Sequence, residues 1–365
     1  MTLPKGVSIM KTLLIIITAV LLCTNVSAQE IIPYSGAEKN LENRWQWASE
    51  KANQTNENKY WIVYTFERLM NQNSYIGSFN RHYKDETKLG ELLYPNAPKD
   101  YFESLNYLDH NTSKAKVKKE LALLFRIRKG KIIDTQISTI DLPFQFEKLP
   151  IYWLGIAEEQ ESIKLIIRKY DQIKDPEAKE SLVSAAGMHK NAPQSFDFLK
   201  EIIENEKDSE LREDAVFWIG HLDDKKAIPL LINIAKNDRS EDVAEKAVFS
   251  LHNIESDTAV DALIDLAKNL RNGDVREKAI FWVGQLASKK AEAALNDIVY
   301  SDEETEIQEK AVFALSQLDD GRGVTKLIKI AKTHPNKAVR KKAIFWLGQS
   351  EDDRALDALI EMVQK

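Results

Sequence analysis

The sequence predicts an all-α solenoid of seven helical hairpins, each about 32 residues long, preceded by a small α+β domain. Three observations support this fold class. An aromatic motif recurs at a fixed period, apolar residues within each unit follow helical spacing, and residues 29–145 lack the repeat. A fixed period of this length is typical of stacked repeats, which bury a continuous core only by packing against their neighbours.

The repeat is clearest in five copies of one motif. The copies read AVFWIGHL, AVFSLHNI, AIFWVGQL, AVFALSQL and AIFWLGQS, and they begin 32 residues apart at Ala215, Ala247, Ala279, Ala311 and Ala343. Two weaker copies precede them, PIYWLG from Pro150 and LVSAAG from Leu182. We therefore predict that the repeats occupy residues 146–365.

Each repeat is expected to contain two helices. Leu211, Ala215 and Ile219 recur at helical spacing in the first half of one unit, and Ala227 and Leu231 begin the same pattern in its second half. Short polar turns join the halves. Neither helix buries its apolar face alone, so the core must form between stacked units.

The motif resembles that of the HEAT family, in particular the short bacterial type called phycobilisome-lyase-like HEAT. The residues that carry the resemblance are V-R-E-K-A-I-F-W-V-G-Q-L at Val275 to Leu286, followed by A-x-x-A-L from Ala291. The resemblance covers about three-fifths of the chain. It implies an interaction scaffold, although a minority of the family are enzymes.

The sequence lacks the residues that enzymes of this and other families use for catalysis. Deoxyhypusine hydroxylases build a di-iron site from paired His-Glu motifs, and no histidine here is followed by glutamate. Nucleophile-elbow, zinc-protease, phosphate-loop and calcium-loop patterns are absent as well. We predict no catalytic residue, cofactor or metal ligand. His189, His221 and His252 are interpreted as structural residues near helix ends, and the Asp pairs before second helices as N-caps.

The first 28 residues predict a secretory signal peptide. Lys11 precedes an apolar run from Leu13 to Leu22, and Val26-Ser27-Ala28 places small residues before Gln29. We expect cleavage between Ala28 and Gln29, a periplasmic or secreted product, and no stable membrane span. Lipidation at Cys23 is an alternative, disfavoured because Leu22 occupies a position that needs a small residue. Translation could start at Met1 or at Met10.

The region 29–145 is predicted to be an α+β domain of unknown function. Ala37 to Ala52 has a helical pattern, Tyr60 to Phe66 alternates like a strand, and Leu121 to Ser138 resembles a hairpin that turns at Lys129-Gly130. An enzyme site in this domain, with the solenoid as a substrate platform, is the alternative function. Arg68, Arg81 and His82 are polar residues of this domain, and the fold decides whether they form one site.

Charge is uneven along the chain. The whole sequence has a formal charge of −6, but residues 29–150 contain 18 basic and 16 acidic residues. The segment from Lys114 to Lys131 carries eight basic residues and only one acid, Glu120. Nucleic acid is not an expected partner of an exported protein, so contact with an acidic protein surface or simple solvation is the interpretation.

Large and small side chains alternate at one position of successive repeats. The series reads Trp153, Ala185, Trp218, Ser250, Trp282, Ala314, Trp346, and a second series reads Arg212, Ala244, Arg276, Gln308, Arg340. We infer a 64-residue superunit in which small residues make room for the tryptophan of an adjacent repeat. Drift from a duplicated pair of repeats would give the same alternation without a packing role.

Two surfaces of the solenoid are candidate sites for a protein partner. The first is an acidic ribbon on the second helices, which would attract a basic partner and consists of Asp197, Glu201, Asp261, Asp265, Asp297, Asp357 and Glu361. The second is an aromatic stripe on the first helices, which consists of Tyr152, Phe217, Phe249, Phe281, Phe313 and Phe345. The structural alternative for the acidic ribbon is a helix face that only contacts water. The structural alternative for the aromatic stripe is partial burial of the rings between successive first helices.

Overall fold

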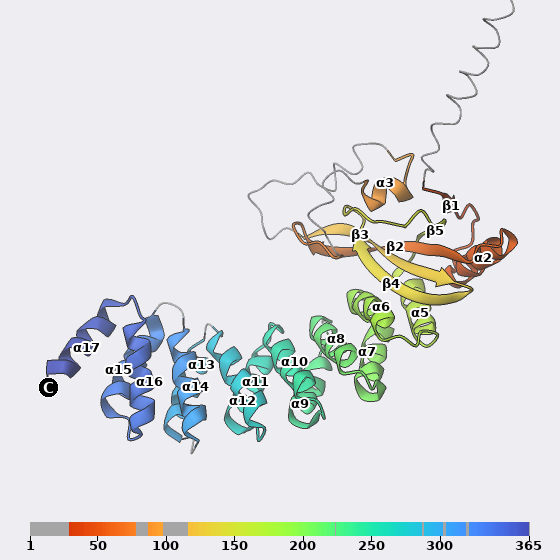
Figure 1. The fold of residues 1–365 in the computed structure, drawn as a ribbon. Coiled ribbons are helices and arrows are strands. Elements are labelled where there is room, and N and C mark those ends of the chain that lie inside the picture. Colours follow the sequence, from red (N-terminus) through yellow and green to blue (C-terminus); the bar gives the residue numbers. More distant parts are fainter. Residues whose placement is uncertain are drawn as a thin grey trace, which may run out of the picture. The chain divides into compact units, whose positions relative to one another are not determined.

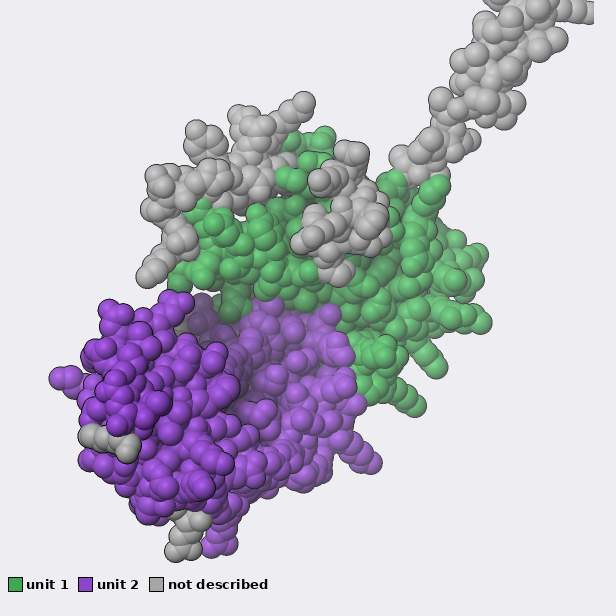
Figure 2. Space-filling model, turned by 60° about the vertical axis from the view of Figure 1, so that its left-hand side comes forward, with its two compact units in different colours: residues 1–178 green, residues 179–365 purple. Residues whose placement is uncertain are grey.

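The computed structural model describes residues 29–77, 87–97, 116–222, 224–286, 288–301, 304–318 and 321–364. The predicted signal peptide, Cys23, Arg81 and His82 lie outside these residues. The chain divides into two compact units, Met1–Ala178 and Lys179–Lys365, which Figure 2 colours separately. Within the described part, no helix is both long and apolar enough to cross a bilayer.

The first unit is built on a mixed five-stranded sheet. Its strands are β1 (Ile31–Pro33), β2 (Lys59–Asn71), β3 (Lys116–Arg128), β4 (Lys131–Thr139) and β5 (Ile151–Ile156), and its helices are α2 (Leu41–Gln54), α3 (Leu89–Leu93) and α5 (Glu159–Tyr170). The strand order is β1-β5-β2-β3-β4. Strand β5 runs parallel to β1 and β2, whereas β2, β3 and β4 are antiparallel neighbours.

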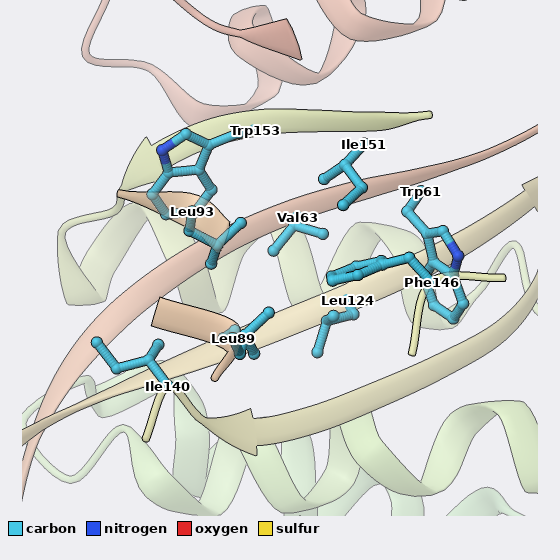
Figure 3. Packing of buried hydrophobic residues seen from close by; sticks show 10 residues of the cluster. Trp61, Val63, Leu89, Leu93, Leu124, Ile140, Phe146, Ile151 and Trp153 are labelled. Atoms are coloured by element: carbon cyan, nitrogen blue, oxygen red, sulfur yellow. The ribbon is translucent and has the colours of Figure 1, made fainter. Parts of the chain in front are cut away.

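Helices cover both faces of this sheet, with α3 on one side and α5 on the other (Figure 1). Alternate residues of each strand therefore enter two cores. On the α3 side, Trp61 and Val63 of β2 pack with Leu124 of β3 and with Leu89 and Leu93 of α3 (Figure 3). On the opposite side, Phe125 makes an edge contact with Trp45 of α2 at 4.9 Å.

The helix, strand and hairpin expected in this unit are all present. Helix α2 overlaps the predicted 37–52 segment, and β2 extends the predicted strand to 13 residues. Strands β3 and β4 form the predicted hairpin, in which Lys129 and Gly130 both have positive φ angles, 51° and 71°. These angles fit a two-residue type I′ turn, whose twist matches that of the paired strands.

The first predicted repeat is wrong in its first half. Residues expected to form a helix from 146 instead enter β5, where Ile151, Tyr152, Trp153 and Leu154 are consecutively buried. Four buried neighbours suit an interior strand covered on both faces rather than a helix with one apolar side. Gly155 has a φ of 80°, which also ends any helical path. The predicted boundary at 146 therefore lies too early.

The helical array comprises six helix pairs in the described residues instead of seven. First helices and second helices alternate along the array, as Figure 1 shows for the row from α8 to α17. The first helices are α6 (Glu177–Met188), α8 (Ser209–His221), α10 (Glu241–His252), α12 (Gly273–Gly284), α14 (Thr305–Ser316) and α16 (Lys337–Gly348). The second helices are α7 (Pro193–Asn205), α9 (Ala227–Asn237), α11 (Asp257–Asn269), α13 (Lys289–Ser301), α15 (Arg322–Thr333) and α17 (Asp353–Gln364).

Polar residues at the turns begin the helices. The carboxylate of Asp208 accepts hydrogen bonds from the backbone N–H groups of Glu210 and Leu211 at 3.0 and 3.1 Å. Of the predicted aspartate caps, Asp224 accepts from Lys226 N–H at 2.8 Å, but Lys226 precedes the first turn of α9, so Asp224 is not the N-cap of that helix. Asp352 accepts from Arg354 N–H at 2.9 Å in the first turn of α17. Such caps satisfy donors that have no partner in the first helical turn.

Candidate functional site

The predicted acidic ribbon is a ladder of ion pairs between successive second helices. Lys236 Nζ lies 3.1 Å from Asp265 Oδ2, and Lys268 Nζ lies 2.9 Å from Asp297 Oδ2. Lys332 pairs with Glu361 at 2.5 Å, and Lys290 pairs with Asp261. In each pair the two residues are 29 positions apart and come from adjacent repeats.

This lysine–carboxylate ladder neutralises the part of the ribbon that was expected to be most acidic. The pKa of Asp265 is lowered, first by the hydrogen bond from the Asn269 side chain and then by Lys236. The remaining ribbon residues, Asp197, Glu201 and Asp357, are exposed and have no ion-pair partner in the described part of the chain. The structure therefore does not bring the seven carboxylates together as one field of negative charge.

A second ladder of ion pairs, which is not among the predicted sites, joins the first helices. Glu245 pairs with Lys278 at 3.0 Å, and Glu309 with Lys342 at 3.7 Å. Glu277 pairs with Lys310, whose pKa is raised by that hydrogen bond. The signal was present in the sequence as a Glu-Lys pair in adjacent positions of consecutive repeats, because each glutamate reaches the lysine one repeat further on.

The aromatic stripe forms a row of half-buried rings on the first helices of the array. Phe217 and Phe249 are stacked, with ring centroids 6.2 Å apart and planes 9° apart. Phe281 is 37% exposed and Phe345 is 55% exposed, whereas Phe313 is half-buried. Half-exposed aromatic rings in a row offer apolar contact area that water covers in the isolated protein.

Tyr152 does not belong to this stripe. It lies in β5 of the first unit, is fully buried, and contacts Tyr60 with ring centroids 5.3 Å apart. Its hydroxyl donates to Glu57 Oε2 at 2.8 Å. The sequence placed Tyr152 in the series because PIYWLG matches the repeat motif, but the segment pairs with strands rather than with helices.

Sequence comparisons identify the repeats. A profile described as HEAT repeats matches residues 196–280 and 260–333, and a profile described as PBS lyase HEAT-like repeat matches residues 339–365. The helical array consists of HEAT repeats. No curated protein matches the chain.

Several solved structures are similar to about half of this chain. Human deoxyhypusine hydroxylase is 14% identical, with 56% of this chain and 90% of that chain covered and a TM-score of 0.30. The CpcE–CpcF complex of phycocyanin lyase from Nostoc is 23% identical, covers 54% and 79%, and has a TM-score of 0.33. The Escherichia coli protein YibA is 21% identical, covers 56% and 76%, and has a TM-score of 0.34. Likenesses at this level do not identify an activity.

Tryptophans of the HEAT array flank the aromatic stripe. Trp282 contacts Phe249 and Phe281, with centroid distances of 5.0 Å in both pairs. Trp346 likewise contacts Phe313 at 4.9 Å and Phe345 at 5.0 Å. Each of these two tryptophans therefore links the phenylalanine of its own repeat to that of the preceding repeat.

Small residues in the alternating series permit close approach of first helices. A Cβ added to Gly220 would lie 2.8 Å from Cβ of Ser250, and one added to Gly284 would lie 2.9 Å from Cβ of Ala314. Serine and alanine thus face a glycine of the preceding repeat. This differs from the expected arrangement, in which every small residue makes room for a tryptophan.

The histidines of the HEAT array make structural contacts. Nδ1–H of His189 donates to the carbonyl of Ala185 at 2.5 Å, and Nδ1–H of His221 donates to that of Phe217 at 2.8 Å. The His252 ring lies 4.6 Å from the Trp282 ring, and burial lowers its pKa. No group of three His, Cys, Asp or Glu side chains placed to hold a metal ion occurs among the described residues.

A small polar group interrupts the α3-side core of the first unit. The hydroxyl of Tyr94 donates to the carboxylate of Glu120 and lies 3.3 Å from the hydroxyl of Thr65. Thr65 and Glu120 are buried, at 0% and 6% exposure. No sequence motif marks these three residues, because only the sheet register brings β2 and β3 beside Tyr94.

Proposed function

We propose that this chain is a non-catalytic scaffold that binds a protein partner along the aromatic stripe of its HEAT array. The observation that carries the proposal is the contrast between the two candidate surfaces. The most acidic part of the ribbon is compensated by its own lysines, whereas the stripe leaves Phe281 and Phe345 partly open to water. Aromatic residues are enriched among the few that dominate protein interfaces.

Charge contributes less to this proposed interface than shape and apolar contact. A basic partner would have to compete with lysines already bound to Asp261, Asp265 and Asp297. Exposed ion pairs are weak, so exchange of such partners changes little free energy. Burial of aromatic surface is favourable at about 25 cal/mol per Å² and needs no exchange of ion pairs.

Affinity capture with two matched variants tests the scaffold. The double substitution Phe281→Ser and Phe345→Ser removes the two most exposed rings of the stripe. Leu356→Ser is the control, because Leu356 is an apolar residue at least as exposed as either ring, at 59%, and lies on the second helix α17. We expect a stoichiometric protein partner from envelope extract to bind the wild type and the control but not the stripe variant.

The acidic ribbon is tested in the same assay by changing Asp261, Asp265 and Asp297 to lysine. Under the proposal, affinity and its salt dependence remain close to wild type. Loss of the partner from this variant, with retention by the stripe variant, would move the site to the ribbon. Recovery of no partner by any form of the protein would remove the scaffold proposal.

A second candidate function is an enzyme whose site lies in the first unit. The observation in its favour is the buried polar group of Tyr94, Glu120 and Thr65, since a carboxyl held by a hydroxyl is a common acid–base arrangement. Glu120→Gln preserves the shape of the side chain and removes its charge. If this variant alone lost the captured partner, the partner would be a substrate or ligand of the first unit.

We also propose that the protein is exported, with cleavage between Ala28 and Gln29. The support comes from residues 1–28, which place an apolar run after Lys11 and small residues before Gln29. N-terminal sequencing of the mature protein should begin at Gln29, and fractionation should place it outside the cytoplasm. Full-length chain in the cytosol would overturn the export proposal.

A further inference from the structure

Three cations stand side by side at one end of the first unit's sheet. The register pairs Lys59 of β2 with Arg128 of β3, and Arg128 with Lys131 of β4. Directly opposed residues on neighbouring strands project from the same face of a sheet, and neighbouring strands are about 4.8 Å apart. The turn between β3 and β4 adds Lys129. We call these four exposed residues the basic tip.

The basic tip lacks the ion pairs that Lys118, Lys119 and Arg126 of the same segment make. No carboxylate lies within ion-pair distance of its four cations among the described residues. The nearby carboxylate Glu147 pairs with Arg126 at 2.6 Å. At the other end of β3, Lys118 pairs with Glu67 at 2.9 Å, and Lys119 with Asp141 at 3.3 Å.

The basic tip violates two structural preferences, and both violations keep a positive charge there. Like charges directly opposite each other in a sheet are destabilising, yet the register holds three of them in a row. Lys129 adopts a φ of 51°, a conformation in which Asn, Asp or Gly is preferred at this turn position. Local conflicts of this kind are expected at functional positions, because elsewhere they carry only a cost.

The described chain begins at this same end of the sheet. Gln29 donates through its side chain to the carbonyl of Leu149 at 2.5 Å, and the N–H of Ile151 donates to the carbonyl of Glu30 at 3.0 Å. Ile151 is paired with Trp61, two residues beyond Lys59. The start of the described chain and the basic tip therefore lie at the same end of this sheet.

We propose that the basic tip binds the phosphate headgroups of an anionic membrane surface. Such a surface attracts Lys and Arg side chains within a Debye length, and the attraction grows with each added cation. Ile133 follows Lys131 on the edge strand β4 and is 38% exposed, so an apolar side chain accompanies the cations. This binding is separate from the partner site on the HEAT array.

Vesicle co-sedimentation tests the proposal. The protein is the chain from Gln29 to Lys365, which contains every described residue and lacks the apolar leader. The vesicles are phosphatidylcholine with phosphatidylglycerol, compared with phosphatidylcholine alone. We expect binding only to the anionic vesicles, weaker at high salt. The double variant Arg128→Gln and Lys131→Gln should bind about 25-fold more weakly, at roughly fivefold per cation removed.

Two further variants separate the tip from general charge and from folding. Lys116→Gln with Lys118→Gln removes the same charge from the other end of β3 and should bind like wild type. Lys129→Asn should bind about fivefold more weakly. Its melting temperature should be equal or higher, because Asn suits the left-handed turn position. Weaker binding without lower stability excludes misfolding as the cause.

Three results would overturn the proposal. They are equal binding to neutral and anionic vesicles, equal loss in the Lys116 and Lys118 control, or tip-dependent binding to soluble polyglutamate but not to vesicles. The last result would assign the tip to an acidic polypeptide. Vesicle binding by the purified chain does not depend on processing, so cytosolic full-length protein would refute export and leave this result unaffected.

Discussion

Trp218 of α8 lies directly over Gly187 of α6, so that a Cβ added to this glycine would overlap the indole. The indole Nε1–H donates to the Ser184 hydroxyl at 3.2 Å. Two small residues of one first helix, Ser184 and Gly187, thereby contact a tryptophan of the next first helix. The packing of α8 on α6 therefore requires a residue without a Cβ atom at position 187.

Gly187→Ala should destabilise the array by about 1–3 kcal/mol, because the indole must shift out of a well-packed position. Gly348→Ala is the matched control. Gly348 occupies the equivalent position of α16, and nothing lies within 4 Å of its added Cβ. There the helical preference for alanine should stabilise by up to about 1 kcal/mol. Urea unfolding of both variants measures the difference, and equal effects would contradict the packing relationship.

The alternating series predicts unequal costs for exchanging large and small residues. Trp282 is half-buried, so Trp282→Ala should cost about 2–3 kcal/mol, below the usual range for a fully buried ring. Ala314 is 1% exposed and faces Gly284, so Ala314→Trp should cost about 3 kcal/mol or more through overpacking. Denaturant unfolding measures the free energy of unfolding of both variants. If both lay within about 0.5 kcal/mol of wild type, the alternation would reflect duplication of a repeat pair and would have no packing role.

His252 should make stability depend on pH. Burial lowers its pKa below the ordinary value of 6.5, so the unfolded chain binds a proton more readily than the folded chain in that window. Its contribution is therefore complete above pH 6.5 and is lost as pH falls through the folded pKa. His252→Gln should reduce the rise in unfolding free energy between about pH 5 and 7. An unchanged slope would show that the histidine does not contribute.

The ladder on the second helices should respond to charge reversal and its repair. Asp265→Lys places two cations together at Lys236 and should destabilise by about 1 kcal/mol, less at high salt. Adding Lys236→Asp restores an opposite-charge pair in reversed order and should recover most of the loss. A double-mutant cycle in urea measures the coupling. Additive effects would mean that the ion pair contributes no stability.

Sequence periodicity accounts for most of the fold because helices and hairpins are set by neighbouring residues. The 32-residue period locates the first and second helices of the HEAT array, since the 3.6-residue spacing of apolar positions such as Leu211, Ala215 and Ile219 is local. The β3–β4 hairpin was predictable for the same reason, with Lys129-Gly130 between two alternating segments. These elements need no distant partner to be recognised.

The first repeat was mispredicted because its identity depends on distant partners. PIYWLG matches the repeat motif, yet Ile151 pairs with Trp61 and with Ile31, far away in the chain. A short apolar run fits a buried strand as well as a buried helix, and only the available neighbours decide. Tyr152 was therefore assigned to a helical surface and lies instead inside a sheet.

The sequence by itself determined the repeat period, the helix pairs and the alignment of carboxylates along the second helices. Only the tertiary structure decided that lysines 29 positions away neutralise Asp261, Asp265 and Asp297, and that Lys59, Arg128 and Lys131 form an uncompensated row. The physical reason is the separation along the chain of the residues that set each property. Helical and strand periods are properties of a few consecutive residues, whereas charge compensation depends on distances of a few ångströms between segments that only the packed chain brings together.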